Sequence, residues 1–418
     1  MNEQLFKLAC EQFQALGVDV EAALQKLEQI PIAIHAWQGD DVHGFESTGH
    51  ALTGGCQVTG NYPGCARTAE ELRADLDLAI SLIPGSKLRV CLQGHQVDCL
   101  EAGQDRDSYS MKNFAGWLEW AKQKKLGMDI APAYYGHPKL DNGLSLSHPD
   151  AAVRNFWINH GKACRRIAAQ FSSELNAGPS VCNQWAPDGY KDTPADRYAP
   201  RVRLAESLDE IFSEEIPKSQ LLDAVEPKLF GIGVESYTVG SADFYLTYAA
   251  RRNKLICLDT GHFHPTESIA DKISAICCQQ GEILLHVSRG VRWDSDHVCV
   301  LNDDLKNLMA EVVAYNNLEK VQLCLDYFDG SINRVAAWVI GTRATQKALL
   351  MALLTPKCAA EAEAKFDFTA RMAMQERDKN LPYGIVWEYF LASRGIPSDS
   401  AMLQPIRAYE EDVLLARG

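Results

Sequence analysis

Four segments between residues 221 and 326 each join a short apolar run to carboxylate or imidazole side chains, and this pattern constrains the fold more than any other feature. Each apolar run has the length of a β-strand, and roughly a helix's worth of chain separates one segment from the next. This is the layout of successive βα units with polar groups where the strands end. The segments are LLDAVEPK (221–228), LICLDTGHFHP (255–265), ILLHVSRGVRWDSDH (283–297) and VQLCLDYFDG (321–330).

The same alternation extends over most of the chain and gives eight strand–helix units. The strand segments are apolar almost throughout, as parallel strands buried on both faces are. Eight such units predict an α/β fold of the (β/α)₈ TIM-barrel type. The expected strands are 30–37, 88–93, 128–133, 180–185, 221–228, 255–259, 283–287 and 321–327. The expected helices are 69–83, 111–125, 151–175, 201–214, 242–252, 265–278, 304–315 and 332–354.

Helical segments flank the predicted barrel. Residues 1–29 have apolar positions at helical spacing and predict N-terminal helices, residues 30–354 form the catalytic barrel, and residues 355–418 form a charged C-terminal helical extension that we expect to serve oligomerisation. An open doubly wound sheet is the alternative fold. It would need a glycine-rich phosphate turn after its first strand, and the WQGDD at residues 37–41 does not provide one.

Composition narrows the classes of partner. The 418 residues carry a net charge of −14, which disfavours nucleic acid and anionic membranes because both attract a basic surface. We find no signal-peptide core and no apolar run long enough to span a membrane, so a cytoplasmic protein is expected. The 13 cysteines are scattered without a C-x-x-C pair, and in that compartment we expect reduced thiols.

Ligand-type side chains follow four consecutive strands of the predicted barrel. Glu226, Asp259, His286 and Asp326 stand at or near strand ends, and in barrel enzymes these ends converge at one rim. Three carboxylates and one imidazole form a mostly oxygen site that suits Mn²⁺ or Mg²⁺, with Zn²⁺ and Co²⁺ also possible. The spacing therefore predicts a metal site.

A second and more open site is predicted beside the first. His262 lies three residues after Asp259, and Asp294 and Asp296 follow His286. Each of these residues also has an ordinary explanation, because aspartates often cap turns and a lone histidine in an apolar run is often a core residue. Taken together at the ends of four strands, they favour a two-metal centre.

A lysine and several aromatic residues are expected at the mouth of the barrel. Lys228 shares a strand face with Glu226, so its ammonium would either neutralise excess carboxylate or polarise a substrate oxygen. Trp37, Trp185 and Phe263 would line the mouth, as suits a sugar site or an ordinary barrel rim. The long glycine-rich loop 38–66 is expected to fold as a lid over its own site or a neighbour's.

Longer motifs resemble a known family. The EPK at 226–228 is similar to that of xylose isomerase, and the chain resembles the L-rhamnose isomerase family over essentially its whole length. The matching segments are WQGDDV (37–42), LTGG (52–55), TGNYPG (59–64), FGIGVESYTVG (230–240), LDTGHFH (258–264), HVSR (286–289), VRWDSDH (291–297) and SINR (331–334).

The resemblance implies a homotetrameric barrel enzyme that interconverts L-rhamnose and L-rhamnulose with two divalent metals per subunit, typically Mn²⁺. Aldose–ketose isomerisation by a metal-assisted hydride shift is therefore the expected reaction. Metal-dependent phosphodiester hydrolysis and sugar binding without catalysis are the alternatives. The implied residues are Glu226, Asp259, His286 and Asp326 at a structural metal; His262, Asp294 and Asp296 at a catalytic metal; Lys228 and Asp326 in catalysis; and Trp185, Lys228, Val42 and Leu52 around the sugar.

The second strand departs from the family pattern. The family has a histidine there near the sugar ring, whereas this strand ends in Gln93 and carries a histidine two residues later, at His95. Residues 93 and 95 would share a face if the strand continued. Either residue could then fill the position of the family's histidine.

Overall fold

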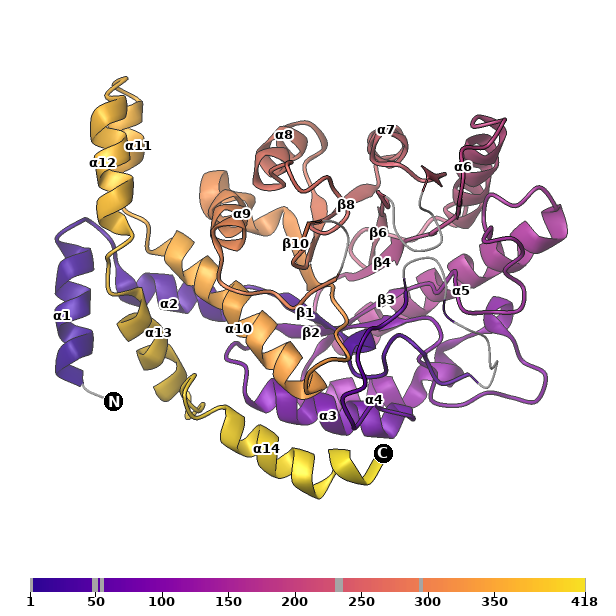
Figure 1. Ribbon diagram of the computed structural model, residues 1–418, viewed down its shortest axis with the longest axis horizontal. Helices are drawn as coiled ribbons and strands as arrows, with labels where there is room; N and C mark the ends of the chain where they lie inside the picture. Colours follow the sequence, from indigo (N-terminus) through magenta and orange to yellow (C-terminus); the bar gives the residue numbers. More distant parts are fainter. Residues whose placement is uncertain (1–2, 47–51, 53–55, 230–235, 293–295, 418) are drawn as a thin grey trace.

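Eight parallel strands close into a barrel in the computed structural model, which describes residues 3–46, 52, 56–229, 236–292 and 296–417, without the side chains of 315–317 (Figure 1). The strands lie in chain order around the barrel, and the last pairs with the first. The predicted barrel is therefore confirmed. The strands are β1 (Ile32–His35), β2 (Leu88–Gln93), β3 (Gly127–Ala131), β4 (Ser180–Gln184), β6 (Leu221–Val225), β8 (Leu255–Asp259), β9 (Ile283–Val287) and β10 (Val321–Leu325).

Helices surround the barrel and continue beyond it at both ends of the chain (Figure 1). The α-helices are α1 (Glu3–Gln14), α2 (Val20–Glu28), α3 (Ala69–Ser81), α4 (Ala115–Lys124), α5 (Ala151–Leu175), α6 (Ala199–Ile211), α7 (Ala242–Arg252), α8 (Ala270–Gln280), α9 (Asp303–Val313), α10 (Arg334–Leu353), α11 (Cys358–Glu363), α12 (Phe368–Asp378), α13 (Tyr383–Ala392) and α14 (Leu403–Asp412). Short 3₁₀ helices are η1 (Ala36–Gln38), η2 (Arg106–Ser108), η3 (Met111–Phe114), η4 (Ala314–Glu319) and η5 (Leu414–Arg417).

Local side chains set where the barrel helices begin. The hydroxyl of Thr68 accepts a hydrogen bond from a backbone N–H in the first turn of α3, and Ser241 does the same for α7. Asn302 and Asn333 cap α9 and α10 through their amide oxygens. These caps satisfy N–H groups that have no partner inside the helix, so these four helices each begin at a fixed residue.

Two details of the fold differ from the expectation. The helix expected over 265–278 begins only at Ala270, and residues 260–269 form a turn-rich segment that includes Pro265. A two-stranded antiparallel pair, β5 (Gly189–Tyr190) and β7 (Tyr237–Thr238), lies outside the barrel sheet. Its strands are too short to produce an alternating pattern that could be recognised in the sequence.

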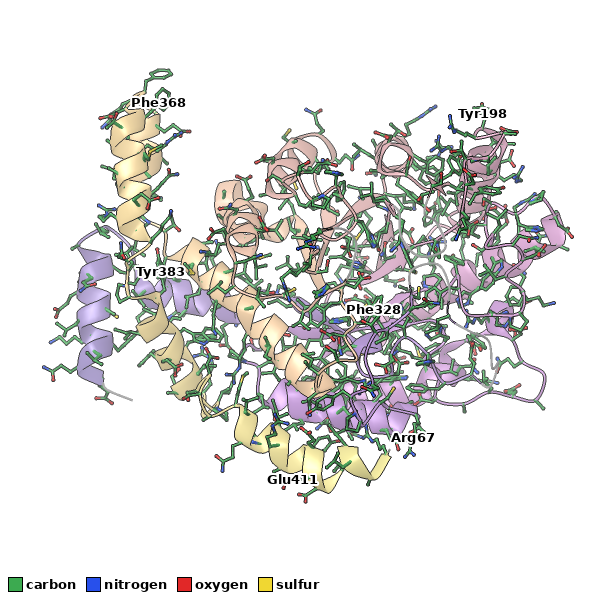
Figure 2. The ribbon with its side chains drawn as sticks, in the orientation of Figure 1. Arg67, Tyr198, Phe328, Phe368, Tyr383 and Glu411 are labelled. Atoms are coloured by element: carbon green, nitrogen blue, oxygen red, sulfur yellow. The ribbon has the colours of Figure 1, made fainter. Side chains whose placement is uncertain are left out.

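The C-terminal helices return to the start of the chain. The rings of Phe6 in α1 and Tyr389 in α13 stack with their centroids 3.5 Å apart. On α3, Asp75 accepts hydrogen bonds from Tyr409 of α14 and from Arg417. Helices α11 and α12 project away from the barrel, with Phe368 at their outer end, whereas Phe328 lies near the middle of the molecule (Figure 2).

The structure also bears on two expectations from composition. All 13 cysteines are free thiols. Among the described residues, no helix combines the length and the apolar character that crossing a membrane would require.

A pair of glycine substitutions tests the packing of α10 on the barrel. An alanine at Gly341 would place its Cβ on the hydroxyl of Tyr327 and 2.7 Å from the ring carbon that bears it. We expect Gly341→Ala to destabilise the fold by about 1–3 kcal/mol, because the buried ring cannot yield without disturbing the core. Thermal unfolding followed by circular dichroism measures the effect.

Gly384→Ala in α13 is the matched control, since no atom lies within 4 Å of the position of its Cβ. Alanine is a better helix former than glycine, so this variant should unfold at the same temperature as the wild type or slightly higher. Equal unfolding temperatures for the two variants would contradict the packing of Tyr327 against α10.

Candidate metal centre

Four of the predicted ligands meet at one end of the barrel. Glu226 directly follows β6, Asp259 ends β8, His286 lies in β9, and Asp326 directly follows β10. One ligand atom from each lies within 4.8 Å of the others. Register explains the convergence, because Asp259 and His286 are paired residues on adjacent parallel strands.

Three carboxylates are directed at the same ring nitrogen. The Nδ1 atom of His286 is 2.8 Å from Oδ2 of Asp326, 3.3 Å from Oε2 of Glu226 and 3.8 Å from Oδ2 of Asp259. A ring nitrogen carries at most one proton, so it cannot donate to three acceptors at once. Moreover, Oδ2 of Asp259 is buried and accepts no hydrogen bond from a described residue. This arrangement fits ligands around a divalent cation.

Outer donors hold the three carboxylates in place. Every one of the three carboxylates accepts at least one hydrogen bond from a residue outside the four-ligand set. Such donors orient ligands and tune a metal site. The bonds run from Trp37 Nε1 to Asp326 Oδ1 (3.0 Å), from Asn183 Nδ2 to Glu226 Oε2, and from the Gly261 backbone N–H (2.6 Å) and Ser288 Oγ (3.1 Å) to Asp259 Oδ1.

Several ionisable groups lie close together in the centre, and this shifts their pKa values. Burial raises the pKa of Asp259 to about 7; the carboxylates of Asp326 and Glu226 add to this rise, while His262 and His286 oppose it. Burial alone would lower the pKa of His286, but Cys257, Glu226 and Asp326 raise it well above its usual value. Several acidic groups thus share one buried space, and a bound cation would offset their repulsion.

The predicted second ligand set lies beside the first. Nδ1 of His262 is 3.0 Å from Oε1 of Glu226, so the two sets are in contact. Asp296 is buried and lines the same pocket. Asp294 lies outside the described residues. The structure thus brings two of the three predicted residues to the edge of the first set.

A pocket of about 480 Å³, part of it open to solvent, opens over these groups. The ring of Trp185 lies nearly parallel to that of His262, with an interplanar angle of 13° and centroids 6.2 Å apart. The ammonium nitrogen of Lys228 is 5.5 Å from the centroid of the Trp185 ring. The pocket therefore combines an aromatic wall and a cation with the acidic centre, as the sites of small polar ligands do.

The apolar side of the pocket contains part of the expected set. Val42 and Phe328 line it. Leu52 packs against the apolar cluster inside the barrel that includes Val42, but it is not among the residues lining this pocket. Phe263, which we expected at the mouth, lines a different hollow between the segments that precede α8 and α9.

The second strand settles which side chain faces the pocket. Strand β2 ends at Gln93, and the chain then turns, with the N–H of Gln96 donating to the carbonyl of Gln93. The two side chains therefore do not share a strand face. Gln93 lines the pocket, whereas His95 is buried against Gly44 of the loop after β1.

Sequence reasoning missed Asn183, which lines the pocket and donates to Glu226. A signal was available, because Asn183 lies two residues before Trp185 and alternate residues of a strand share a face. Another possible ligand group, Asp41 with His43 and Cys65, is close enough to hold an ion. Both oxygens of Asp41 already accept hydrogen bonds from Arg334. We therefore assign Asp41 to an ion pair with Arg334 and not to a metal site.

Comparisons with known proteins identify one family over essentially the whole chain. The family model described as L-rhamnose isomerase (RhaA) matches residues 1–417. The L-rhamnose isomerase of Rhodopirellula baltica is 52% identical over 416 residues, covering 99% of this chain and 97% of its own. The enzyme of the same name from Enterobacter sp. (strain 638) is 52% identical over 417 residues, covering 100% and 99%, respectively.

Solved structures show a more distant likeness. A D-psicose 3-epimerase from Clostridium cellulolyticum H10 has 11% sequence identity and a TM-score of 0.43, with 81% of this chain and 99% of that chain covered. A likeness at this level adds nothing to the barrel that the strand order already defines.

Replacing Trp37 tests the outer donors of the centre. Trp37→Phe keeps a ring but removes the N–H that holds Asp326. We expect the dissociation constant for Mn²⁺ to rise by about 10-fold, the lower end of the range for lost outer-shell bonds. Isothermal titration of metal-free protein measures it.

Trp338→Phe is the control, because Trp338 is equally buried and its N–H donates to the His35 carbonyl rather than to a ligand. It should bind Mn²⁺ as the wild type does. If Trp37→Phe also bound with unchanged affinity, Asp326 would not be a ligand that Trp37 orients.

Proposed function

The chain belongs to the L-rhamnose isomerase family and is an isomerase, and we propose that it interconverts L-rhamnose and L-rhamnulose by a hydride shift at a two-metal centre. The observation that carries the proposal is the convergence of Asp326, Glu226 and Asp259 on Nδ1 of His286. A full-length identity of 52% to proteins named for that reaction supports the choice of sugar.

The residues present fit a pair of divalent cations. Glu226, Asp259, His286 and Asp326 would hold the structural ion, and His262, Asp294 and Asp296 the catalytic one. Bound cations of this kind supply Lewis-acid polarisation of sugar oxygens and a lowered pKa for water. The donors are mostly carboxylate oxygens, which suit Mn²⁺ or Mg²⁺ better than Zn²⁺ or Co²⁺, and the resemblance to the family favours Mn²⁺.

The reaction moves one hydrogen between neighbouring carbons of the open-chain sugar. The C2 hydroxyl loses its proton, hydrogen passes with its electron pair from C2 to C1, and the C1 oxygen gains a proton. C2 is oxidised and C1 is reduced by the same amount, so no external redox partner is needed. The protein must stabilise negative charge on the two oxygens while the hydrogen moves.

Side chains of the pocket supply that stabilisation and orient the sugar. Lys228 carries a positive charge into the pocket beside the acidic centre and would stabilise the developing alkoxide. Asp326, fixed by Trp37, would keep its ligand geometry through the reaction. Trp185 would cover one face of the sugar, and Val42 and Leu52 would form the apolar surface for its methyl group.

We extend the proposal to the assembly. The protein would work as a cytoplasmic homotetramer on a small sugar, without nucleic-acid or membrane partners. Residues 355–418 would serve the subunit contacts, outside the barrel of residues 30–354 and its N-terminal helices 1–29. The exposed side chains of Phe368 and Met372 on α12, and of Phe366 in the turn before it, support this, because they would be buried between subunits.

Metal removal and isotopic labelling test the reaction. With Mn²⁺ the protein should convert L-rhamnose, and dialysis against EDTA should abolish activity until Mn²⁺ is restored. L-Rhamnose carrying deuterium at C2 should give L-rhamnulose with deuterium at C1, observed by NMR. Loss of the label to water would contradict the hydride shift, and full activity in EDTA would contradict the metal requirement.

Lys228→Met tests the charge beside the centre. It keeps most of the side-chain volume and removes the ammonium, so we expect kcat to fall about 100-fold, the cost of losing one preorganised donor to a developing oxyanion. Mn²⁺ affinity should change little. Lys254→Met is the control, because Lys254 pairs with Asp223 away from the pocket; a similar fall in its kcat would remove any special role for Lys228.

A further inference from the structure

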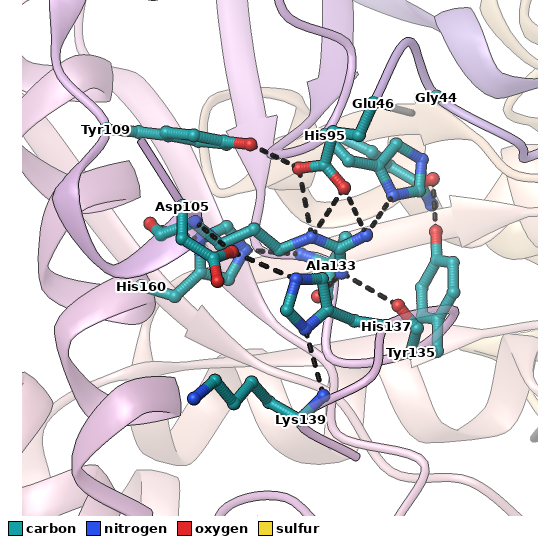
Figure 3. Close-up of polar contacts among 12 residues, drawn as sticks. Gly44, Glu46, His95, Asp105, Tyr109, Ala133, Tyr135, His137, Lys139 and His160 are labelled. Carbon is teal, nitrogen blue, oxygen red and sulfur yellow. Dashed lines mark hydrogen bonds and ion pairs between the residues drawn. The ribbon is translucent and has the colours of Figure 1, made fainter. Parts of the chain in front are cut away.

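A buried guanidinium group lies one layer behind the pocket. Arg106 in η2 is 1% exposed, and the Glu46 side chain that it binds is 4% exposed. Nε of Arg106 is 3.0 and 2.9 Å from the two oxygens of Glu46, and Nη2 is 2.7 Å from Oε2. Nη1 donates to the carbonyls of Ala133 (2.6 Å) and Tyr135 (2.7 Å) (Figure 3).

The partners of Arg106 come from two segments that form walls of the pocket. Glu46 belongs to the loop after β1, which also carries Val42. Ala133 and Tyr135 follow β3, directly after Pro132, which lines the pocket. Arg106 itself is not a lining residue, so it acts on the pocket through these two segments.

The loop after β1 is also fitted closely to its surroundings. The N–H of Phe45 donates to the carbonyl of His95 at 3.0 Å. A Cβ on Gly44 would lie 2.5 Å from Cγ of His95, so only glycine allows this approach. The hydroxyl of Tyr109 donates to Glu46 from the other side of the carboxylate (Figure 3).

The segment after β3, whose carbonyls Arg106 binds, is held by further hydrogen bonds. Nε2 of His160 accepts a hydrogen bond from the N–H of Ala133 at 3.0 Å, and its Nδ1 donates to the carbonyl of Arg106 at 3.1 Å. Leu52 lies over the segment after β3, because its Cδ2 is 3.1 Å from where a Cβ on Gly136 would be. Val42 and Leu52 are the two side chains proposed to contact the methyl group. Val42 lies on one segment that Arg106 binds, and Leu52 packs over the other.

We propose that Arg106 is a positioning residue that sets the methyl-recognising wall of the sugar pocket by joining Glu46 to the carbonyls of Ala133 and Tyr135. A buried charge pair is a costly way to hold a loop, and apolar packing could do it more cheaply. A forked guanidinium instead fixes direction as well as distance, because its N–H donors have a rigid geometry. The inference rests on the proposed function, because the position of Val42 and Leu52 affects catalysis only if these residues bind the methyl group of the sugar.

The sharpest test compares two sugars that differ only at this wall. L-Lyxose has the configuration of L-rhamnose at C2 to C4 but lacks the methyl carbon. A well-formed apolar pocket distinguishes one such group by about 10- to 200-fold. We expect Arg106→Met to lower the ratio of kcat/KM for L-rhamnose to that for L-lyxose about tenfold, mainly through KM for L-rhamnose, with Mn²⁺ affinity unchanged.

The ratio of the two kcat/KM values distinguishes a displaced pocket wall from a loss of folded enzyme, because the amount of folded enzyme cancels in the ratio. Glu46→Gln, which keeps shape and removes charge, should lower the ratio in the same direction and provides the test if Arg106→Met folds poorly. Arg165→Met is the matched control. Arg165 is also 1% exposed, binds both oxygens of Asp223 and donates to two carbonyls, but none of these partners lines the pocket.

Hydrogen exchange of residues 38–46 gives a readout that needs no turnover. It should speed up about tenfold or more in Arg106→Met and stay unchanged in Arg165→Met. An unchanged sugar ratio in both Arg106→Met and Glu46→Gln, or equal changes in Arg165→Met, would overturn the inference. A wild-type protein inactive on both sugars would contradict the proposed function alone, and exchange would still decide whether Arg106 holds the loop.

Discussion

Mutual repulsion among buried carboxylates is the constraint on which the centre depends. Glu226 and Asp259 are buried, Asp326 is half-buried, and all three carboxylates are directed at a single ring nitrogen of His286. Such a cluster can exist only if a rigid frame prevents the chain from separating the charges and if positive charge is supplied. The closed barrel is that frame, because each ligand lies on or next to a strand that is hydrogen-bonded on both sides.

Much of this centre could be predicted from local patterns. An apolar run of strand length fixes both the element and the place where its last residue emerges, so Asp259 and Asp326 were assigned to one rim without any long-range information. Parallel register then brings Asp259 beside His286. Glu226 follows from the same rule, and Lys228 follows because alternate residues of an extended segment share a side.

What sequence reasoning missed depends on turns and on contacts between distant segments. The strand ends at Gln93 as expected, but the turn that follows directs His95 away from the pocket, and no periodicity in the sequence predicts the direction of that turn. Arg106 and Glu46 are 60 positions apart in loops without regular spacing. Phe263 comes soon after Asp259, the last residue of β8, yet the turn-rich chain before α8 takes it to another hollow.

The barrel closes where its first strand, β1, pairs with its last strand, β10. Strand β1 pairs with β10 through Ile32 and Leu323, so the final ladder forms only after nearly three hundred intervening residues have been made. During synthesis on the ribosome, β1 therefore has β2 on one side and an open edge on the other until late in translation. An unpaired strand edge can pair with another chain, so the closing ladder between β1 and β10 removes an aggregation site that exists only while the chain is incomplete.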